Sequence, residues 1–263
     1  MNTMCPVALP LVVAIATSME AAAVLQGLGI AQPAPAPGHD MECLVAGRTL
    51  RFIVTGTGPI NAAIAAGRVI THPVAGLVCL GVAGTYALAA APLGTAVVAT
   101  RETWPEYGLA TKDGVEAFAL GFPQWGDKHD IDPPPVWDSL HLEPKLSYRA
   151  MRLPYLVTSV PREANNPFVV AGASVTVAGV TATRERAREL SGKHAALMEN
   201  MEGFALALAA RQAGIPFGEV RTISNIVGER ASTAWNMPVA LAALGRVAQL
   251  LFATSTLPER AGG

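Results

Sequence analysis

Short apolar runs and helical patterns alternate along the first part of the chain. Residues 11–16 are entirely apolar and predict a buried strand, while residues 18–28 carry a helical pattern that ends in glycines. Residues 42–46 and 50–55 flank Gly47 and predict a hairpin. Buried strands that alternate with helices are typical of an α/β domain.

The next stretch, residues 73–100, contains no Asp, Glu, Lys or Arg and is long enough to cross a bilayer. Glycines and a proline divide it into residues 76–82 and 94–100, which predict two buried strands around a tight turn instead of a membrane span. The apolar residues 7–15 are similar to a signal-peptide core. Such a core follows positive charge, whereas the first Lys or Arg here is Arg48. We therefore expect a cytoplasmic protein with no membrane partner.

The middle of the chain has a different composition. Residues 121–167 are rich in proline, tryptophan and charge, and no period of 2 or 3.6 residues holds there. This pattern predicts a lid or a surface insertion. Because no second apolar core is visible in it, we predict one domain over residues 1–263.

Regular patterns return after this insertion. Together with the first hundred residues they predict a three-layer α/β sandwich with a mixed, twisted central sheet. The remaining predicted elements are helices at 62–70, 182–191, 203–213 and 237–253 and strands at 173–180 and 217–223.

Composition and charge narrow the classes of partner. Of the 263 residues, 51% are hydrophobic and only 15% are charged, and the net charge is −1. Nucleic-acid binding is not expected, because it needs a basic face, and neither is disorder. With a mean hydropathy of +0.35, the chain has more apolar surface than one compact domain easily buries, so we expect a homo-oligomer, at least a dimer.

Candidate chemistry lies at four strand ends or helix starts. These are Glu20, the segment 81–85, the pair Met201–Glu202 and the segment 221–225. Each alone has an ordinary structural explanation, such as a carboxylate that stabilises a helix N-terminus or a glycine turn. The sequence contains no metal-ligand spacing and no P-loop, so neither a metal nor an organic cofactor is expected.

Taken in order along the chain, these pieces resemble the nucleoside phosphorylase superfamily, which includes methylthioadenosine nucleosidase. The resemblance covers nearly the whole chain except residues 121–167. It implies a nucleoside phosphorylase-like fold and a small-molecule nucleoside as substrate. The segments 199–203 and 223–225, and Val227–Arg230 followed by Trp235, resemble one hydrolytic subfamily more closely.

The resemblance also implies roles for individual residues. Glu202 falls where the family holds the ribose hydroxyls, and Met201 where a methionine packs under the sugar. Glu20 falls where the nucleosidases activate water, and Arg221 where an arginine supports that water. Asn225 falls where methylthioadenosine nucleosidase has an aspartate that acts on the purine. The expected lining of the base and ribose is completed by Val82, Ala83, Gly84 and Ser224.

An asparagine at position 225 has a chemical consequence. Its amide NH2 can donate both to N7 and to the C6 oxygen of a 6-oxopurine. An adenine would instead present its own donor to that NH2. Asn225 therefore predicts a hypoxanthine leaving group, with a discrimination of about 1–3 kcal/mol against adenine.

Three functional classes stay open at this point: a hydrolase, a phosphorylase and a non-catalytic binding protein. A phosphorylase must bind a dianion, commonly with arginines, yet no Lys or Arg precedes Arg48, and Glu20 would repel phosphate. Hydrolysis is therefore favoured over phosphorolysis, while a non-catalytic nucleoside-binding protein would not need Glu20. The stacking aromatic of the nucleosidases is absent near Ala182. Candidates to replace it are Phe204, Trp104, Tyr107 and Phe122, and candidates to bind an acidic substituent on the 5′ side are Arg101, Arg149, Arg152 and Arg230.

Overall fold

The computed structural model describes residues 8–112, 114–159, 166–229, 231 and 235–253. Within these residues, the strands are β1 (Leu11–Ile15), β2 (Asp40–Val45), β3 (Arg48–Val54), β4 (Gly76–Thr85), β5 (Ala96–Thr103), β6 (Leu109–Thr111), β7 (Gly114–Glu116), β8 (Ser139–His141), β9 (Val169–Thr176), β10 (Met198–Asn200) and β11 (Phe217–Ile226). The helices are α1 (Ser18–Gly27), α2 (Pro59–Val69), α3 (Pro144–Ala150), α4 (Leu156–Ser159), α5 (Arg184–His194), α6 (Gly203–Ala213) and α7 (Met237–Ala248). A π-helical turn, Gln249–Ala253, continues α7.

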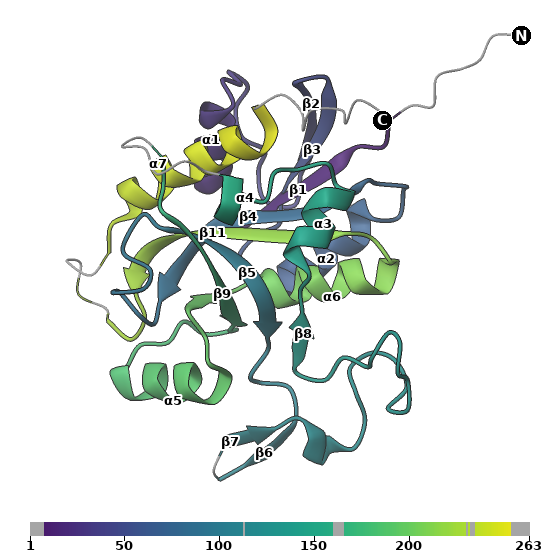
Figure 1. Cartoon of the computed structure of the whole chain (residues 1–263), viewed down its shortest axis with the longest axis vertical. Coiled ribbons are helices and arrows are strands. Elements are labelled where there is room, and N and C mark those ends of the chain that lie inside the picture. Colours follow the sequence, from purple (N-terminus) through teal and green to yellow (C-terminus); the bar gives the residue numbers. More distant parts are fainter. Residues whose placement is uncertain (1–7, 113, 160–165, 230, 232–234, 254–263) are drawn as a thin grey trace, which may run out of the picture.

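Nine of the described strands form one mixed sheet in the order β10-β9-β5-β11-β4-β1-β3-β2, with β8 paired to β5. Strands β3, β1, β4 and β11 are consecutive in the sheet and run parallel to one another. On either side of these four, β2 is antiparallel to β3 and β5 is antiparallel to β11. The end of β4 also pairs with β10, so the sheet curls back toward itself. Strands β6 and β7 form a separate ribbon at one end of the molecule (Figure 1).

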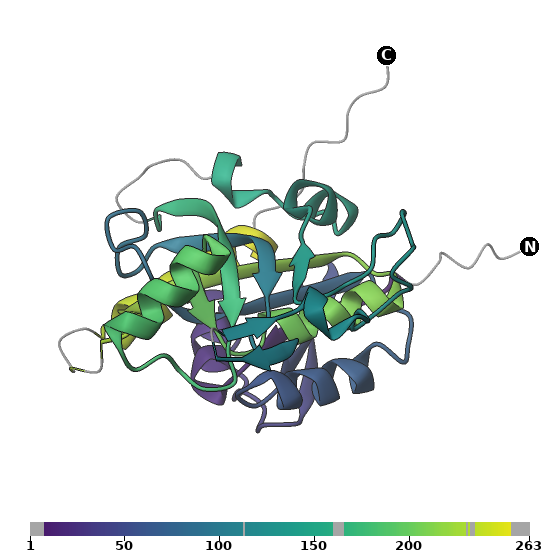
Figure 2. The ribbon, with the colours of Figure 1, turned by 90° about the horizontal axis from the view of Figure 1, so that it is seen from below.

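Helices cover both faces of the sheet and complete three layers. Residues of α1, α3, α4 and α7 pack against one face, and residues of α2 and α6 pack against the other. Figure 2 shows α2 on the side of the sheet opposite α3 and α4. Helices α1 and α7 approach each other at Gly27 and Gly245, where a Cβ on Gly27 would lie 2.1 Å from the Gly245 carbonyl oxygen. Glycine at this contact permits the close approach of the two helices.

The structure confirms the α/β class and most predicted elements, and it corrects several details. Strands β4 and β5 are not partners around a tight turn, because β11 lies between them in the sheet. Strand β9 begins and ends four residues earlier than predicted, at Val169–Thr176. Strand β10 was not predicted, since its three residues are too short to show a period.

The segment 121–167 does more than cover the surface. Its strand β8 pairs with β5, and Tyr148 and Met151 at α3 are fully buried in the core, where both lie beside Gly218 of β11. This burial was not predicted from the sequence, because the buried residues do not follow a helical or strand period over enough residues. The second half of the segment is therefore part of the core of the same sheet.

Among the described residues, no helix combines the length and the apolar character that crossing a membrane requires.

Candidate active site

A cavity of about 180 Å³ lies at the carboxyl ends of the parallel strands β1, β4 and β11, beside the start of α6. Ligand sites in open α/β sheets form at this edge, where strand ends from distant parts of the sequence meet. The residues predicted from sequence that line it are Glu20, Val82, Ala83, Gly84, Met201, Glu202, Ser224 and Asn225. The ninth, Arg221, is 1% exposed and lies beneath the lining.

Glu20 is held at the first turn of α1 by the loop that follows β1. The backbone N–H of Thr17 and its hydroxyl donate to Oε2 of Glu20, at 3.0 and 2.6 Å. The backbone N–H of Val82 donates to Oε1 at 2.8 Å. Burial raises the pKa of the Glu20 carboxyl above its ordinary value, and the bonds from Thr17 and Val82 oppose that shift. Glu20 is thus a fixed carboxylate with an increased affinity for a proton.

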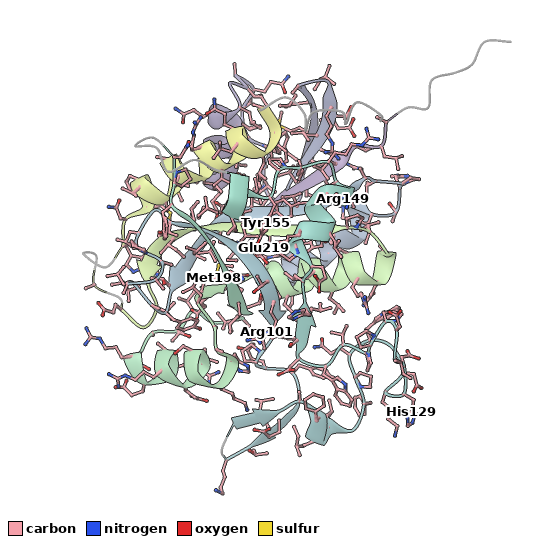
Figure 3. The ribbon with its side chains drawn as sticks, viewed as in Figure 1. Arg101, His129, Arg149, Tyr155, Met198 and Glu219 are labelled. Carbon is pink, nitrogen blue, oxygen red and sulfur yellow. The ribbon has the colours of Figure 1, made fainter. Side chains whose placement is uncertain are left out.

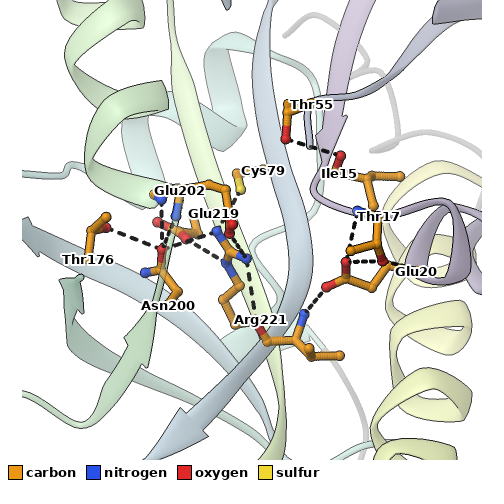
Figure 4. A network of polar contacts seen from close by, with 12 residues as sticks. Ile15, Thr17, Glu20, Thr55, Cys79, Thr176, Asn200, Glu202, Glu219 and Arg221 are labelled. Carbon is orange, nitrogen blue, oxygen red and sulfur yellow. Dashed lines mark hydrogen bonds and ion pairs between the residues drawn. The ribbon is translucent and has the colours of Figure 1, made fainter. Parts of the chain in front are cut away.

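Glu202 and Arg221 form a buried ion pair (Figure 4). The Nη1 atom of Arg221 lies 3.2 Å from Oε2 of Glu202, and the backbone N–H of Gly58 donates to Oε1 at 2.9 Å. Both side chains are less than 6% exposed. A charge removed from water in this way needs a partner and hydrogen bonds, and these contacts give Glu202 one orientation.

Arg221 also lies close to Glu20. A Cβ on Gly81 would be 2.7 Å from Nη1 of Arg221 and 2.9 Å from Oε1 of Glu20. Both atoms therefore approach the same point on β4, a position that only glycine leaves open. The glycine at 81 allows the Arg221 cation to lie close to both Glu20 and Glu202.

Asn225 takes its position from an irregularity in β11. The pairing of β11 with β4 shifts register between Ile223 and Asn225, and such a bulge redirects side chains at the end of a strand. The Ser224 hydroxyl lies 2.9 Å from Oδ1 of Asn225 and donates to it. The amide Nδ2 of Asn225 lies 3.3 Å from the carbonyl of Ile226.

Sequence reasoning missed the aromatic ring of the cavity. None of Phe204, Trp104, Tyr107 and Phe122 lines it. Phe204 is 2% exposed and packs in the core on the α6 side, with its ring 6.0 Å from that of Trp104. Trp235 lines the cavity instead and forms an isolated bridge with Asn225. The sequence does contain a signal for this aromatic residue, because Trp235 follows β11 closely in the chain.

Further lining residues also come from segments without a strong pattern. Thr57 lies before α2, and Val180 follows β9. Glu199, on the unpredicted strand β10, accepts from the hydroxyl of Tyr86 at 2.7 Å and from the backbone N–H of Thr181 at 3.0 Å. The pairing of β10 with β4 brings this carboxylate to the cavity.

The arginines considered for an acidic substituent lie elsewhere. Arg101 donates from Nη2 to the carbonyl of His194, and Arg149 is on α3, as Figure 3 shows. Neither of these, nor Arg152, lines the cavity. Arg230 lies outside the described residues. The cavity lining that the structure describes contains three carboxylates and no Lys or Arg.

Comparison with known proteins agrees with this architecture. The Phosphorylase superfamily matches residues 10–254. The chain belongs to this superfamily, as its motifs indicated. In fold it is similar to a methylthioadenosine/S-adenosylhomocysteine nucleosidase from Helicobacter pylori, with a TM-score of 0.69 and 14% identity over 92% of this chain and 96% of that one.

Within the superfamily, the similar curated proteins are futalosine hydrolases. One from Streptomyces coelicolor is 33% identical over 92% of this chain and 96% of its own length. Another, from Acidothermus cellulolyticus, is 32% identical over 86% of this chain and 83% of its own. The solved futalosine hydrolase of Helicobacter pylori has a TM-score of 0.68 and 15% identity over 91% of this chain and 94% of that one.

Proposed function

We propose that this chain is a nucleosidase that hydrolyses the N-glycosidic bond of futalosine and releases hypoxanthine. The observation that carries the proposal is that Glu20, Glu202 and Asn225 line one cavity together, in a chain about one-third identical to futalosine hydrolases over most of its length. The corresponding pathway is menaquinone biosynthesis, and the compartment is the cytoplasm.

Glu202 stabilises the sugar as the glycosidic bond breaks. The C1′–N9 electron pair leaves with the purine, and positive charge develops on the ribose. A fixed carboxylate close to that charge stabilises the transition state more than the ground state. Glu202 meets this requirement because Gly58 and Arg221 hold both of its oxygens, and the same carboxylate accepts hydrogen bonds from the 2′- and 3′-hydroxyls.

Glu20 activates the attacking water. The water oxygen forms the new bond to C1′ and transfers a proton to the Glu20 carboxylate. The departing hypoxanthine anion takes up one proton from solvent and Glu20 later releases one to solvent, so the protons balance. The raised pKa of Glu20 favours this transfer, because a base with a higher proton affinity is more effective while it stays ionised. Arg221, beside both carboxylates, limits their mutual repulsion.

Asn225 stabilises the departing base. Its amide NH2 donates to N7 and to the C6 oxygen as negative charge develops on hypoxanthine. Met201 packs under the ribose, and Trp235 supplies the aromatic surface that the purine contacts. No metal or organic cofactor takes part.

A phosphorylase and a non-catalytic nucleoside-binding protein are the alternatives. The described lining carries three carboxylates and no cation, which disfavours binding of a phosphate dianion. The test is incubation with futalosine, inosine and methylthioadenosine, each with and without phosphate. We expect hypoxanthine release from futalosine at a rate that phosphate does not change; a phosphate requirement would indicate a phosphorylase, and no release would indicate a binding protein.

We also propose that the chain assembles at least as a dimer. Helix α2 exposes Ile60 and Ile64, which are 74% and 59% exposed in the single chain. These apolar side chains lie on one helix face at i and i+4, and burial against another copy would remove them from water. A molar mass from light scattering at micromolar concentration tests this proposal, and a monomer would contradict it.

A further inference from the structure

Beneath the cavity lie two carboxyl groups that the reaction above does not use. Glu102 on β5 is 0% exposed and Glu219 on β11 is 1% exposed. Carboxylates are almost never buried to this degree without a cation or another compensating group. Their burial therefore requires an explanation in the surrounding contacts.

The two carboxyl groups face each other across the first residue of α6. A Cβ on Gly203 would lie 2.4 Å from Oε1 of Glu102 and 2.6 Å from Oε1 of Glu219. Two points so close to a third cannot be more than about 5 Å apart. At that separation in a dry site, two negative charges repel strongly, and one of the groups keeps its proton.

Hydrogen bonds connect this pair to the groups of the cavity. Oε1 of Glu219 accepts from Nε of Arg221 at 2.8 Å. Oε1 of Glu102 accepts from Nδ2 of Asn200 at 2.8 Å. The Oδ1 atom of Asn200 accepts from the backbone N–H groups of Glu202 and Gly203, at 2.8 and 2.7 Å. Arg221 and Asn200 thus both link the pair to Glu202.

The charges around the pair do not balance without a proton. Arg221 is the cation of the cluster, and it already pairs with Glu202 as well as Glu219. No donor among the described residues reaches Oε2 of Glu219. Burial first, and then the neighbouring Glu219, raise the pKa of the Glu102 carboxyl well above its usual range. A proton on Glu102 removes one of these charges.

We propose that Glu102 and Glu219 share one proton and act as a positioning pair, which fixes Arg221 and Asn200 and, through them, Glu202. The positioning role rests on the function proposed above. Neither residue touches the cavity, so neither is a catalytic residue. The titratable groups that face the pair are Glu202 at the start of α6, Arg221 on β11, Cys79 on β4 and Tyr148 on α3.

Glutamine at position 102 should reproduce the neutral charge of the protonated acid and its contacts with Asn200 and Thr176. Its amide oxygen can accept from Asn200, as Oε1 does now. Its NH2 can donate to Oγ1 of Thr176, which now donates to Oε2 of Glu102 at 2.6 Å. The Thr176 hydroxyl then turns to Oδ1 of Asn200, which is 3.2 Å away. Glu102→Gln therefore keeps the contacts and removes only the ability to ionise.

The first experiment measures folding and needs no substrate. Denaturant unfolding of the parent and of Glu102→Gln is followed from about pH 5 to pH 8. In this range an unfolded glutamate is ionised, whereas Glu102 in the folded parent keeps its proton at every pH below its raised pKa. The folded-to-unfolded ratio of the parent should therefore fall relative to that of the variant by about tenfold per pH unit. Glu42→Gln, an exposed change on β2, is the control and should run parallel to the parent.

The second experiment measures futalosine turnover in the parent and in two variants. Glu102→Gln should keep at least about one-third of the parent kcat/KM, whereas Glu102→Ala should lose at least about tenfold, because Asn200 and Thr176 lose their partner. Parallel pH curves for the parent and Glu102→Gln would overturn the shared proton. Equal losses in the glutamine and alanine variants would overturn the positioning role. Divergent pH curves together with no futalosine turnover would uphold the shared proton and reject the proposed function.

Discussion

The hydroxyl of Ser224 donates to Oδ1 of Asn225 at 2.9 Å. Since the amide oxygen is engaged in this way, a ligand in the cavity meets the NH2 of Asn225, which exchanges its 3.3 Å contact with the carbonyl of Ile226 for hydrogen bonds to the ligand. Ser224 also lies 3.2 Å from the carbonyl of Ala83, and its single proton can serve only one acceptor at a time. The side chain that we propose as the purine contact, Asn225, is therefore oriented by its own neighbour in β11.

Substitution of Asn225 by aspartate should change the preferred base. A protonated aspartate can donate to N7 and accept from the amine of adenine, while it mispairs with the C6 oxygen of hypoxanthine. We expect the ratio of kcat/KM for futalosine to that for its adenine analogue to fall by roughly 10- to 100-fold, or about 1–3 kcal/mol. If this ratio does not change, another part of the cavity determines which base is preferred.

Gly81 should not tolerate a side chain. The Cβ of alanine would lie 2.7 Å from Nη1 of Arg221 and 2.9 Å from Oε1 of Glu20, so both charged groups must move. We expect Gly81→Ala to lower the unfolding free energy by about 1–3 kcal/mol and to lower kcat by on the order of 100-fold. The matched control is Gly67→Ala on α2, which has open space around its Cβ and should stabilise the helix by about 0.5–1 kcal/mol. Equal behaviour of the two variants would contradict the account of Gly81.

The acid side of the pH profile should report Glu20. Burial raises the pKa of this carboxyl above 4.5, and a protonated carboxyl cannot accept the proton of water. We therefore expect kcat/KM to fall with decreasing pH through a pKa above 4.5. The same shift affects stability. The raised pKa of Glu20 contributes its full stabilisation of the folded protein below the pKa of this carboxyl in the unfolded chain, and that stabilisation is lost as the pH rises through its pKa in the folded protein. An activity that stays constant down to pH 4 would exclude Glu20 as the base.

Met151 tests whether the second half of the 121–167 segment belongs to the core. It is 0% exposed and contacts the glycines of β4 and β11, Gly76 and Gly218. Met151→Ala should lower the unfolding free energy by about 2–5 kcal/mol. Leu146→Ala on α3, where the side chain is 62% exposed, should change it by less than about 0.5 kcal/mol. A small effect of Met151→Ala would mean that the segment only covers the surface.

The sequence predicted the first residues of β1, β4 and β11 correctly, because buried strands are local features, while β4 and β11 each run three residues further than predicted. It could not predict that β10 pairs with the end of β4, which brings Glu199 to the cavity, because that pairing joins distant and very short segments. The sequence also did not indicate that Glu102 and Glu219 are buried. A glutamate in a strand looks the same in sequence whether water or another carboxyl group faces it.

The most direct test of the account is futalosine turnover by the parent and by Glu20→Gln, with binding of futalosine measured separately for each. The glutamine keeps the shape of Glu20 but cannot accept the proton of water. We expect the parent to release hypoxanthine without phosphate, and Glu20→Gln to bind futalosine with similar affinity and turn it over about 10²- to 10⁴-fold more slowly. Unchanged turnover in Glu20→Gln, or a parent that releases no hypoxanthine, would contradict the account.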